Sequence, residues 1–202
     1  MPMPAFTDIT GLLGIAIALG ATVVALPGVR RLSRSRLGGL FAGVVILVLV
    51  PFGTLSAAAC VRGALGDLSV TTLVLLGGAT LRRLTGAVPV ERRVRFAMLA
   101  FVSVAALALY PMALGIGLFD PYRLGYGSTW FLGGLFVVAV ASWFGRVDSL
   151  AVCIALAILA WSVRWYESTN LWDYLLDPLV SFYALGALVA RGVKRILRVR
   201  EG

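Results

Sequence analysis

Residues 96–118, FAMLAFVSVAALALYPMALGIGL, contain no charged side chain, and the segment just before them, 91–95, reads ERRVR. A helix needs about 20 predominantly apolar residues to cross the hydrocarbon core of a bilayer. Arginines collect at the cytoplasmic ends of such helices. This stretch therefore predicts a transmembrane helix that starts at the cytoplasmic face and ends outside the cell.

The composition of the whole chain agrees with that prediction. Of its 202 residues, 60% are hydrophobic and 13% are charged, whereas a soluble domain carries about 25% charged residues. A water-soluble fold of this composition would lack the polar side chains to cover its surface. We therefore expect an all-α, polytopic bundle of transmembrane helices that forms a single transmembrane domain over residues 1–202.

Six further apolar runs lie on either side of the first stretch. The third and seventh runs are short, so five or six full crossings remain an alternative, and the third run extends back toward Val61 in one interpretation. Pro51 and Pro111 lie inside runs and predict kinks, because proline cannot donate a backbone hydrogen bond. The seven predicted spans are Ile9–Gly28, Leu37–Cys60, Leu68–Leu81, Phe96–Leu118, Ser128–Phe144, Leu150–Tyr166 and Pro178–Ala190.

The charges of the connecting segments give the orientation. If residues 30–36 are cytoplasmic, alternation places 82–95, Arg146 and 191–200 on the same side. Only three basic residues then lie outside, namely Arg62, Arg123 and Arg164. Most acidic residues fall outside, whereas Glu91, Asp148 and Glu201 fall inside. The excess of Lys and Arg in short cytoplasmic loops predicts an N-out, C-in protein of a bacterial inner membrane.

Two local features complete the predicted fold. The first residues, MPMPAFTD, carry no Lys or Arg, so they lack the positive region of a signal peptide and we expect the first run to be retained. Pairs of small residues four apart let helix backbones approach closely. Gly39–Gly43, Gly186–Ala190 and Gly14–Ala18 are such pairs, and they predict helix contacts.

Several classes of function are excluded by residue type. The chain has no His, which excludes His-ligated haem or metal and catalysis by a Ser-His or Cys-His pair. Cys60 and Cys153 alone make no zinc site and fall at opposite ends of spans, so we predict no disulfide, no metal and no cofactor. The net charge of +9 sits at span ends, and we expect no nucleic-acid partner. No span has an ionisable residue near its centre, which argues against ion-coupled transport.

The polar residues gather instead in three predicted outer segments, 62–67, 120–127 and 164–177. Two of them overlap stretches that read as motifs, GDLSVTTL at 66–73 and STNLWDYLLDP at 168–178. Residues 170–177 alternate apolar and polar positions at helical spacing, which predicts a short interfacial helix, or a re-entrant turn, before the last span. Asp177 precedes Pro178 and is expected to cap the last span, and Asp67 to cap the third.

We hypothesise that these outer segments form one binding site. Arginines would contact an anion such as phosphate, carboxylates would accept hydrogen bonds or act as a base, and aromatic rings would stack on a sugar or headgroup. The alternative is a purely structural rim, in which Arg164 pairs with Glu167 and Arg123 with Asp120. The candidate residues are Arg62, Asp67, Asp120, Tyr122, Arg123, Tyr126, Arg164, Glu167, Asn170, Trp172, Asp173 and Asp177.

Three functions fit this sequence. The first is a non-catalytic integral subunit of an inner-membrane assembly in envelope lipid or glycan assembly or export, with membrane lipid and other membrane-protein subunits as partners. The second is an enzyme of lipid-linked glycans or phospholipids that acts at the outer face, for which no catalytic residue is assigned. The third is a small transporter or lipid flippase. An open cavity between helices would favour the third, whereas a filled bundle would disfavour it.

Overall fold

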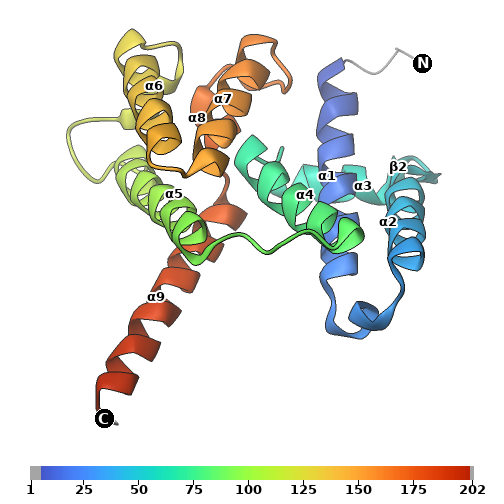
Figure 1. The fold of residues 1–202 in the computed structure, drawn as a ribbon. Helices are drawn as coiled ribbons and strands as arrows, with labels where there is room; N and C mark the ends of the chain where they lie inside the picture. Colours follow the sequence, from blue (N-terminus) through green and yellow to red (C-terminus); the bar gives the residue numbers. More distant parts are fainter. Residues whose placement is uncertain (1–5, 201–202) are drawn as a thin grey trace.

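The computed structural model describes residues 6–200, and this part of the chain is all-helical apart from one short hairpin (Figure 1). The segment 1–5, on which the expected retention of the first apolar run rests, lies outside the described residues. So does Glu201, which was expected on the cytoplasmic side, and so do the side chains of Arg30 and residues 198–200. The elements are α1 (Phe6–Ala25), η1 (Pro27–Arg31), α2 (Arg34–Leu49), β1 (Pro51–Phe52), β2 (Leu55–Ser56), α3 (Ala57–Leu65), α4 (Val70–Thr85), α5 (Arg92–Ala113), η2 (Pro121–Gly125), α6 (Thr129–Phe144), α7 (Asp148–Ser162), α8 (Leu171–Leu175) and α9 (Pro178–Arg200).

The helices form two groups that share α4. In the first group, α1 packs against α2, α3 and α4. In the second, α5 packs against α7 and α9, and α6 packs against α7. Helix α4 also contacts α7, α8 and α9, and it lies between the two groups in Figure 1. Each group has its own apolar core, the smaller one around Ile15 and Ala18 and the larger one around Val102 and Ile154.

One of the three predicted small-residue faces makes a helix contact within the chain. Gly14 of α1 faces α4, where a Cβ built on it would lie 3.3 Å from Leu73. The two other faces are open, because a Cβ at Gly39, Gly43 or Gly186 would meet no described atom within 4 Å. These open faces leave exposed backbone on α2 and α9.

The predicted second span is wrong as a single kinked helix. Helix α2 ends at Leu49, and Pro51–Phe52 pairs antiparallel with Leu55–Ser56 before α3 begins. Pro51 lacks the N–H that would continue the helix. Gly53 adopts φ 75°, the conformation that a two-residue hairpin turn demands. Cys60 therefore lies on α3, separate from α2.

Other span boundaries also differ from the sequence predictions. The third predicted span corresponds to α4, which begins at Val70. It does not extend back to Val61, because Gly66 ends α3 with φ 76°. Pro111 lies in the last turn of α5, so it marks the end of that helix and produces no mid-span kink. The seventh predicted span corresponds to α9, which continues ten residues past the predicted end, Ala190, to Arg200. Cys60 and Cys153 are both free thiols.

The predicted short helix before the last span exists as α8, but it does not lie on a surface. Four of its five residues are buried, including Trp172 and Tyr174, because α8 is enclosed by α7, α4 and η2. Apolar or aromatic side chains occupy both faces of the helix and leave Asp173 as its single charge. The structure therefore confirms a short helix before the last predicted span and shows that the surrounding elements of the fold enclose it.

Two of the described helices are long and apolar enough to cross a membrane, α1 and α5. Helices α6 and α7 are apolar but shorter. Helix length and composition thus support two of the seven predicted spans.

Candidate functional site

The three predicted outer segments do meet, and Arg62 of α3 joins the first of them to the third. Its guanidinium contacts Asp67 at 2.6 Å, Asp8 of α1 at 2.9 Å and Glu167 at 3.7 Å. The hydrogen bonds to Asp67 and Asp8 raise the pKa of Arg62 against the opposing effect of burial, so the side chain stays charged. Arg62 therefore ties the beginning of α1 to α3 and to the segment that follows α7.

Asp177 joins the two sequence motifs. Its Oδ2 accepts hydrogen bonds from the Ser69 backbone N–H at 2.9 Å, from Ser69 Oγ at 2.7 Å and from Thr72 Oγ1. Its Oδ1 accepts from the Val180 N–H at 2.9 Å. The side chain thus caps α9, as predicted, and also meets the amino-terminal end of α4, where both helix dipoles favour its negative charge. Ser69, not Asp67, supplies the cap of α4.

A third cluster forms around Tyr122 of η2. Its hydroxyl donates to Asp173 at 2.9 Å, and its carbonyl accepts from the Asn170 side chain at 2.9 Å. Burial, followed by the Asp173 carboxylate, raises the pKa of Tyr122. Trp172 donates its indole N–H to the Pro121 carbonyl at 2.9 Å. A small cavity of about 270 Å³ adjoins this cluster. Its lining consists of Tyr122, Trp172 and Asp173, three residues of α5, Leu109, Tyr110 and Ala113, and Leu176, which follows α8.

Two stacked tyrosines connect these clusters. Tyr166 and Tyr174 have ring centroids 5.1 Å apart, and the Tyr174 hydroxyl donates to the Ser168 carbonyl at 3.0 Å. Tyr166 is 2% exposed, and its hydroxyl lies near Gly14 of α1 without a hydrogen-bond partner in the described part of the chain. We call the three clusters with these tyrosines the polar network.

The other predicted site residues lie at the edge of the polar network. Asp120 accepts from the Tyr122 N–H at 2.9 Å and so caps η2, and Tyr126 packs edge-on against Tyr122. The expected pairs of Arg123 with Asp120 and of Arg164 with Glu167 do not form, since every ion pair between described residues involves Arg62. The outer segments therefore converge on a packed network, at the place where the sequence analysis hypothesised one binding site.

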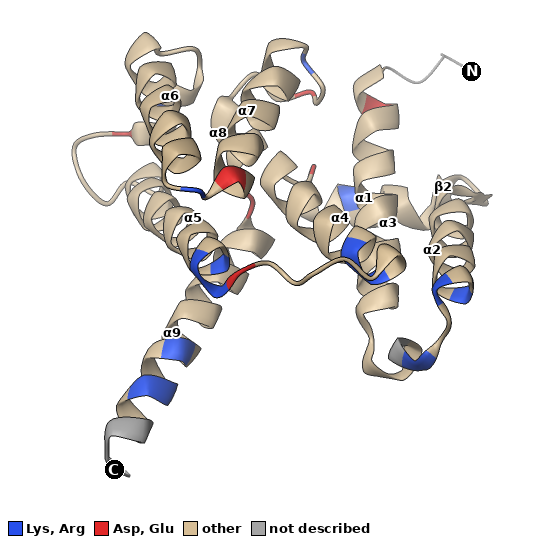
Figure 2. Ribbon diagram, viewed as in Figure 1, with Lys and Arg blue, Asp and Glu red and all other residues tan. Residues whose placement is uncertain are grey.

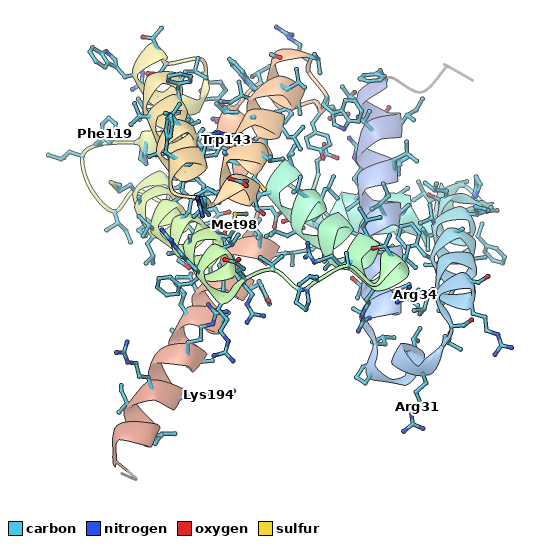
Figure 3. The ribbon with its side chains drawn as sticks, viewed as in Figure 1. Arg31, Arg34, Met98, Phe119, Trp143 and Lys194 are labelled. Atoms are coloured by element: carbon cyan, nitrogen blue, oxygen red, sulfur yellow. The ribbon has the colours of Figure 1, made fainter. Side chains whose placement is uncertain are left out.

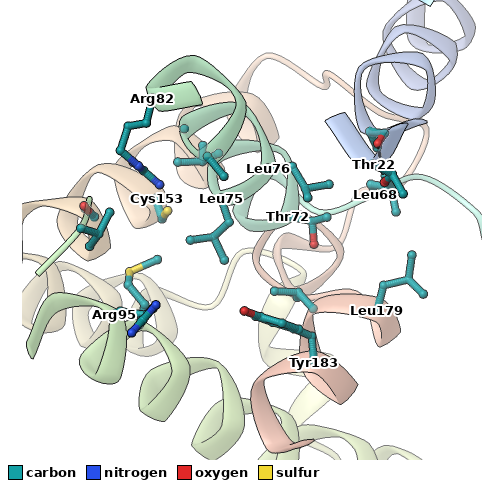
Figure 4. A pocket seen from close by; sticks show the side chains of 18 of the residues that line it. Thr22, Leu68, Thr72, Leu75, Leu76, Arg82, Arg95, Cys153, Leu179 and Tyr183 are labelled. Carbon is teal, nitrogen blue, oxygen red and sulfur yellow. Dashed lines mark hydrogen bonds between the residues drawn. The ribbon is translucent and has the colours of Figure 1, made fainter. Parts of the chain in front are cut away.

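A larger cavity lies elsewhere, between the two helix groups, and the sequence analysis missed it. It has a volume of about 990 Å³ and is lined by residues of α1, α3, α4, α5, α7 and α9. Most of its walls are aliphatic, and Figure 4 shows Leu75, Leu179 and Tyr183 around it. The connection between α4 and α5 adds Ala87, Pro89 and Val90 to the lining.

Charged residues also line this cavity, which we refer to below as the inter-group cavity. Arg82 and Arg83 come from the last turn of α4, Arg95 from the first turn of α5 and Asp148 from the start of α7. Arg83 donates to the Val24 carbonyl of α1. Arg82 and Arg95 have no carboxylate partner within 4.0 Å among the described residues. In the described part of the chain, no cluster of acidic side chains and thiols is arranged to hold a metal ion.

No sequence signal marked this cavity in advance. Its lining residues are ordinary aliphatic side chains, and the arginines read as parts of cytoplasmic loops. No family model, curated protein or solved structure matched this chain. The interpretation of the cavity and of the polar network therefore rests on their geometry and chemistry.

Proposed function

We propose that the chain is an integral protein of a bacterial inner membrane, with seven spans, the N-terminus outside and the C-terminus inside. The distribution of charge supports this proposal. Most Lys and Arg lie toward one end of the molecule, including Arg31, Arg34 and Lys194, and most carboxylates lie nearer the other (Figures 2 and 3). The exposed apolar side chains support it too, since Leu47, Phe136 and Phe182 are 71%, 67% and 75% exposed, as a lipid-facing surface demands.

In this proposal the spans are α1, α2, α4, α5, α6, α7 and α9. A helix of 16 residues, such as α2, α4 or α6, rises about 24 Å, which is less than the hydrocarbon thickness of about 30 Å. Local thinning of the bilayer and arginines that reach the headgroups accommodate such a mismatch at a modest cost.

We further propose that the protein binds a lipid in the inter-group cavity and acts as a small transporter or flippase. The observation that carries this proposal is the cavity of about 990 Å³ between α1, α4, α5, α7 and α9. Ligand sites in proteins have volumes of about 300 to 1,000 Å³ and mostly apolar walls with a few polar groups. A filled bundle would have favoured a purely structural role.

The open glycine faces favour a second candidate, a non-catalytic subunit of an inner-membrane assembly. Helices associate in lipid through small residues that allow close packing. A Cβ on Gly39, Gly43 or Gly186 would meet no atom within 4 Å in the described part of the chain, so these faces are available to another membrane protein. The two roles are compatible, because these glycines do not line the inter-group cavity.

The hypothesis of an enzyme at the outer face has less support. Each of three carboxylates accepts a hydrogen bond from another part of the fold. Asp67 accepts one from Arg62, Asp173 from Tyr122 and Asp177 from Ser69. These contacts explain the carboxylates as structural acceptors. A catalytic acid or base needs access to a substrate, and Asp177 is 5% exposed.

The membrane topology is tested by cysteine labelling in intact cells. Cys60→Ser and Cys153→Ala remove the native thiols, and Arg36→Cys or Arg123→Cys adds one exposed thiol. A membrane-impermeant maleimide is expected to label position 123 in intact cells and position 36 only after permeabilisation. Labelling of position 36 from outside would overturn the orientation.

The lipid-binding role is tested by filling the inter-group cavity. Leu75→Trp adds a large ring on α4 beside Cys153 and Tyr183 (Figure 4), whereas Leu47→Trp adds the same ring on an exposed face. Native mass spectrometry of the purified protein should find co-purified lipid with the wild type and with Leu47→Trp, and little with Leu75→Trp.

A second cavity variant, Ala79→Trp, guards against misfolding of the first. If both cavity variants fold and retain as much lipid as the wild type, the proposed function is wrong.

A further inference from the structure

Two arginines face the inter-group cavity from different helices. Arg82 belongs to the last turn of α4 and Arg95 to the first turn of α5. Figure 4 shows both side chains at the same end of the cavity, with Leu75, Tyr183 and Leu179 farther along it. A positive end and an apolar remainder give the cavity the polarity of an amphipathic ligand.

The other charged side chains of the lining are not equivalent to these two. Arg83 is engaged by the Val24 carbonyl, and Asp148 is a single carboxylate against three arginines of the lining. Arg82 lies along its own helix, where a Cβ on Gly78 would lie 3.3 Å from its guanidinium. The pair Arg82 and Arg95 is thus free, among the described residues, of the carboxylate contacts that hold Arg62.

We propose that the inter-group cavity binds a lipid with a phosphate-containing headgroup, held by Arg82 and Arg95. This inference rests on the lipid-binding function proposed above. Guanidinium groups match phosphate oxygens with two parallel hydrogen bonds. The apolar walls around Leu75, Leu76 and Leu179 contact the hydrocarbon chains of the lipid. These contacts add van der Waals attraction, but they do not distinguish one headgroup from another.

The apolar walls favour a lipid over a free phosphate ion. A free anion would need only the arginines, and it would leave most of a 990 Å³ cavity without a partner. The proposed topology places the segment 82–95, which contains both arginines, at the cytoplasmic face, where the phosphates of the inner leaflet lie. The ligand would therefore enter from that leaflet.

The test compares lipids that share their chains and differ in the headgroup. The full-length protein, purified and delipidated in dodecyl maltoside, is titrated with dioleoyl phosphatidylglycerol, with dioleoylglycerol and with inorganic phosphate, and binding is followed by native mass spectrometry. The variants are Arg82→Gln with Arg95→Gln, and a matched control, Arg36→Gln with Arg93→Gln, at exposed positions outside the cavity.

We expect the wild type and the control to bind phosphatidylglycerol at least about tenfold more tightly than dioleoylglycerol, a ratio equal to about 1.4 kcal/mol. The Arg82 and Arg95 variant should lose that preference and still bind both lipids weakly. Equal binding of the two lipids by the wild type, or an unchanged preference in the variant, would overturn the headgroup assignment and leave the lipid-binding function intact. Inorganic phosphate that competes fully with the lipid would also overturn it. Failure of the Leu75→Trp and Ala79→Trp variants to reduce lipid binding would instead contradict the proposed function.

Discussion

The polar network and the inter-group cavity use the same kinds of residue in opposite ways. In the polar network, Arg62 has three carboxylates around it and Asp177 accepts four hydrogen bonds. In the inter-group cavity, Arg82 and Arg95 have no carboxylate partner among the described residues, and mostly aliphatic side chains line the walls.

This difference separates residues that hold the fold from residues that are available to a ligand. A buried polar group with all its partners inside the chain contributes to stability, and removing one partner leaves the others unsatisfied. A charged group that faces a cavity without a partner adds little to folding and much to binding. Substitutions in the polar network should therefore change stability first, and substitutions in the cavity should change lipid binding first.

The largest expected effect comes from Asp177→Ala. The change leaves the Ser69 N–H, the Ser69 and Thr72 hydroxyls and the Val180 N–H without their acceptor. Each buried unsatisfied group costs about 1 to 3 kcal/mol, and partial relaxation makes a total loss of at least about 3 kcal/mol the expected result. Thermal unfolding in detergent, followed by Trp fluorescence, measures it.

Asp177→Asn keeps one side-chain oxygen and is expected to fall between the wild type and the alanine variant. The double variant of Arg82 and Arg95 should unfold within about 0.5 kcal/mol of the wild type. Unfolding of Asp177→Ala at the wild-type temperature would show that the polar network is not what joins α4 to α9.

A smaller effect is expected from Gly11→Ala in α1. Alanine normally stabilises a helix by up to about 1 kcal/mol relative to glycine, but here the added Cβ would overlap the Arg62 side chain and Asp67. Arg62 must then move and lose its ion pairs, so we expect a net loss of about 1 to 3 kcal/mol.

Gly39→Ala in α2 is the matched control, because its Cβ meets no atom within 4 Å. We expect this variant to be neutral or slightly stabilised as a monomer. The contact of α1 with Arg62 would be in doubt if the two glycine substitutions had the same effect on thermal unfolding.

Local signals in the sequence explain which parts of this fold were predictable. Asp177 followed by Pro178 predicted the start of α9, since capping depends on neighbouring residues. The contact between Asp177 and Ser69 joins residues 108 positions apart, and no local pattern predicts such a pair. Asp67 was wrongly expected to cap α4: it pairs with Arg62, five residues before it, and Ser69 supplies the cap.

Two further errors have a common cause. The continuous apolar composition of Leu37–Cys60 concealed the hairpin at Pro51, because hydropathy reports burial in lipid and not backbone conformation. The inter-group cavity was invisible because a leucine that lines a cavity, such as Leu75, has the same sequence context as a leucine in a packed core.

The smallest expected effect concerns pH. Burial and the Asp173 carboxylate raise the pKa of Tyr122 in the folded protein above the usual value of about 10. Its contribution to stability is therefore fully present below about pH 10 and is lost as the pH rises toward the folded-state pKa.

An ultraviolet titration of tyrosinate absorbance tests this shift against Tyr122→Phe. At about pH 11 the wild type should show less extra absorbance over the variant than one ordinary tyrosine would add, because the raised pKa of Tyr122 opposes its ionisation. Extra absorbance equal to that of one ordinary tyrosine would mean that Tyr122 ionises normally and that its bond to Asp173 is weak.

Photocrosslinking from inside the inter-group cavity tests the central claim most directly. Tyr183, an aromatic residue of the lining, is replaced by p-benzoylphenylalanine in the full-length chain, and intact cells are irradiated before purification. Mass spectrometry should find an adduct with a phospholipid, and the adduct should diminish when Leu75→Trp fills the cavity. Adducts with another protein chain, with no lipid adduct, would contradict the lipid-binding role and assign this surface to a partner subunit.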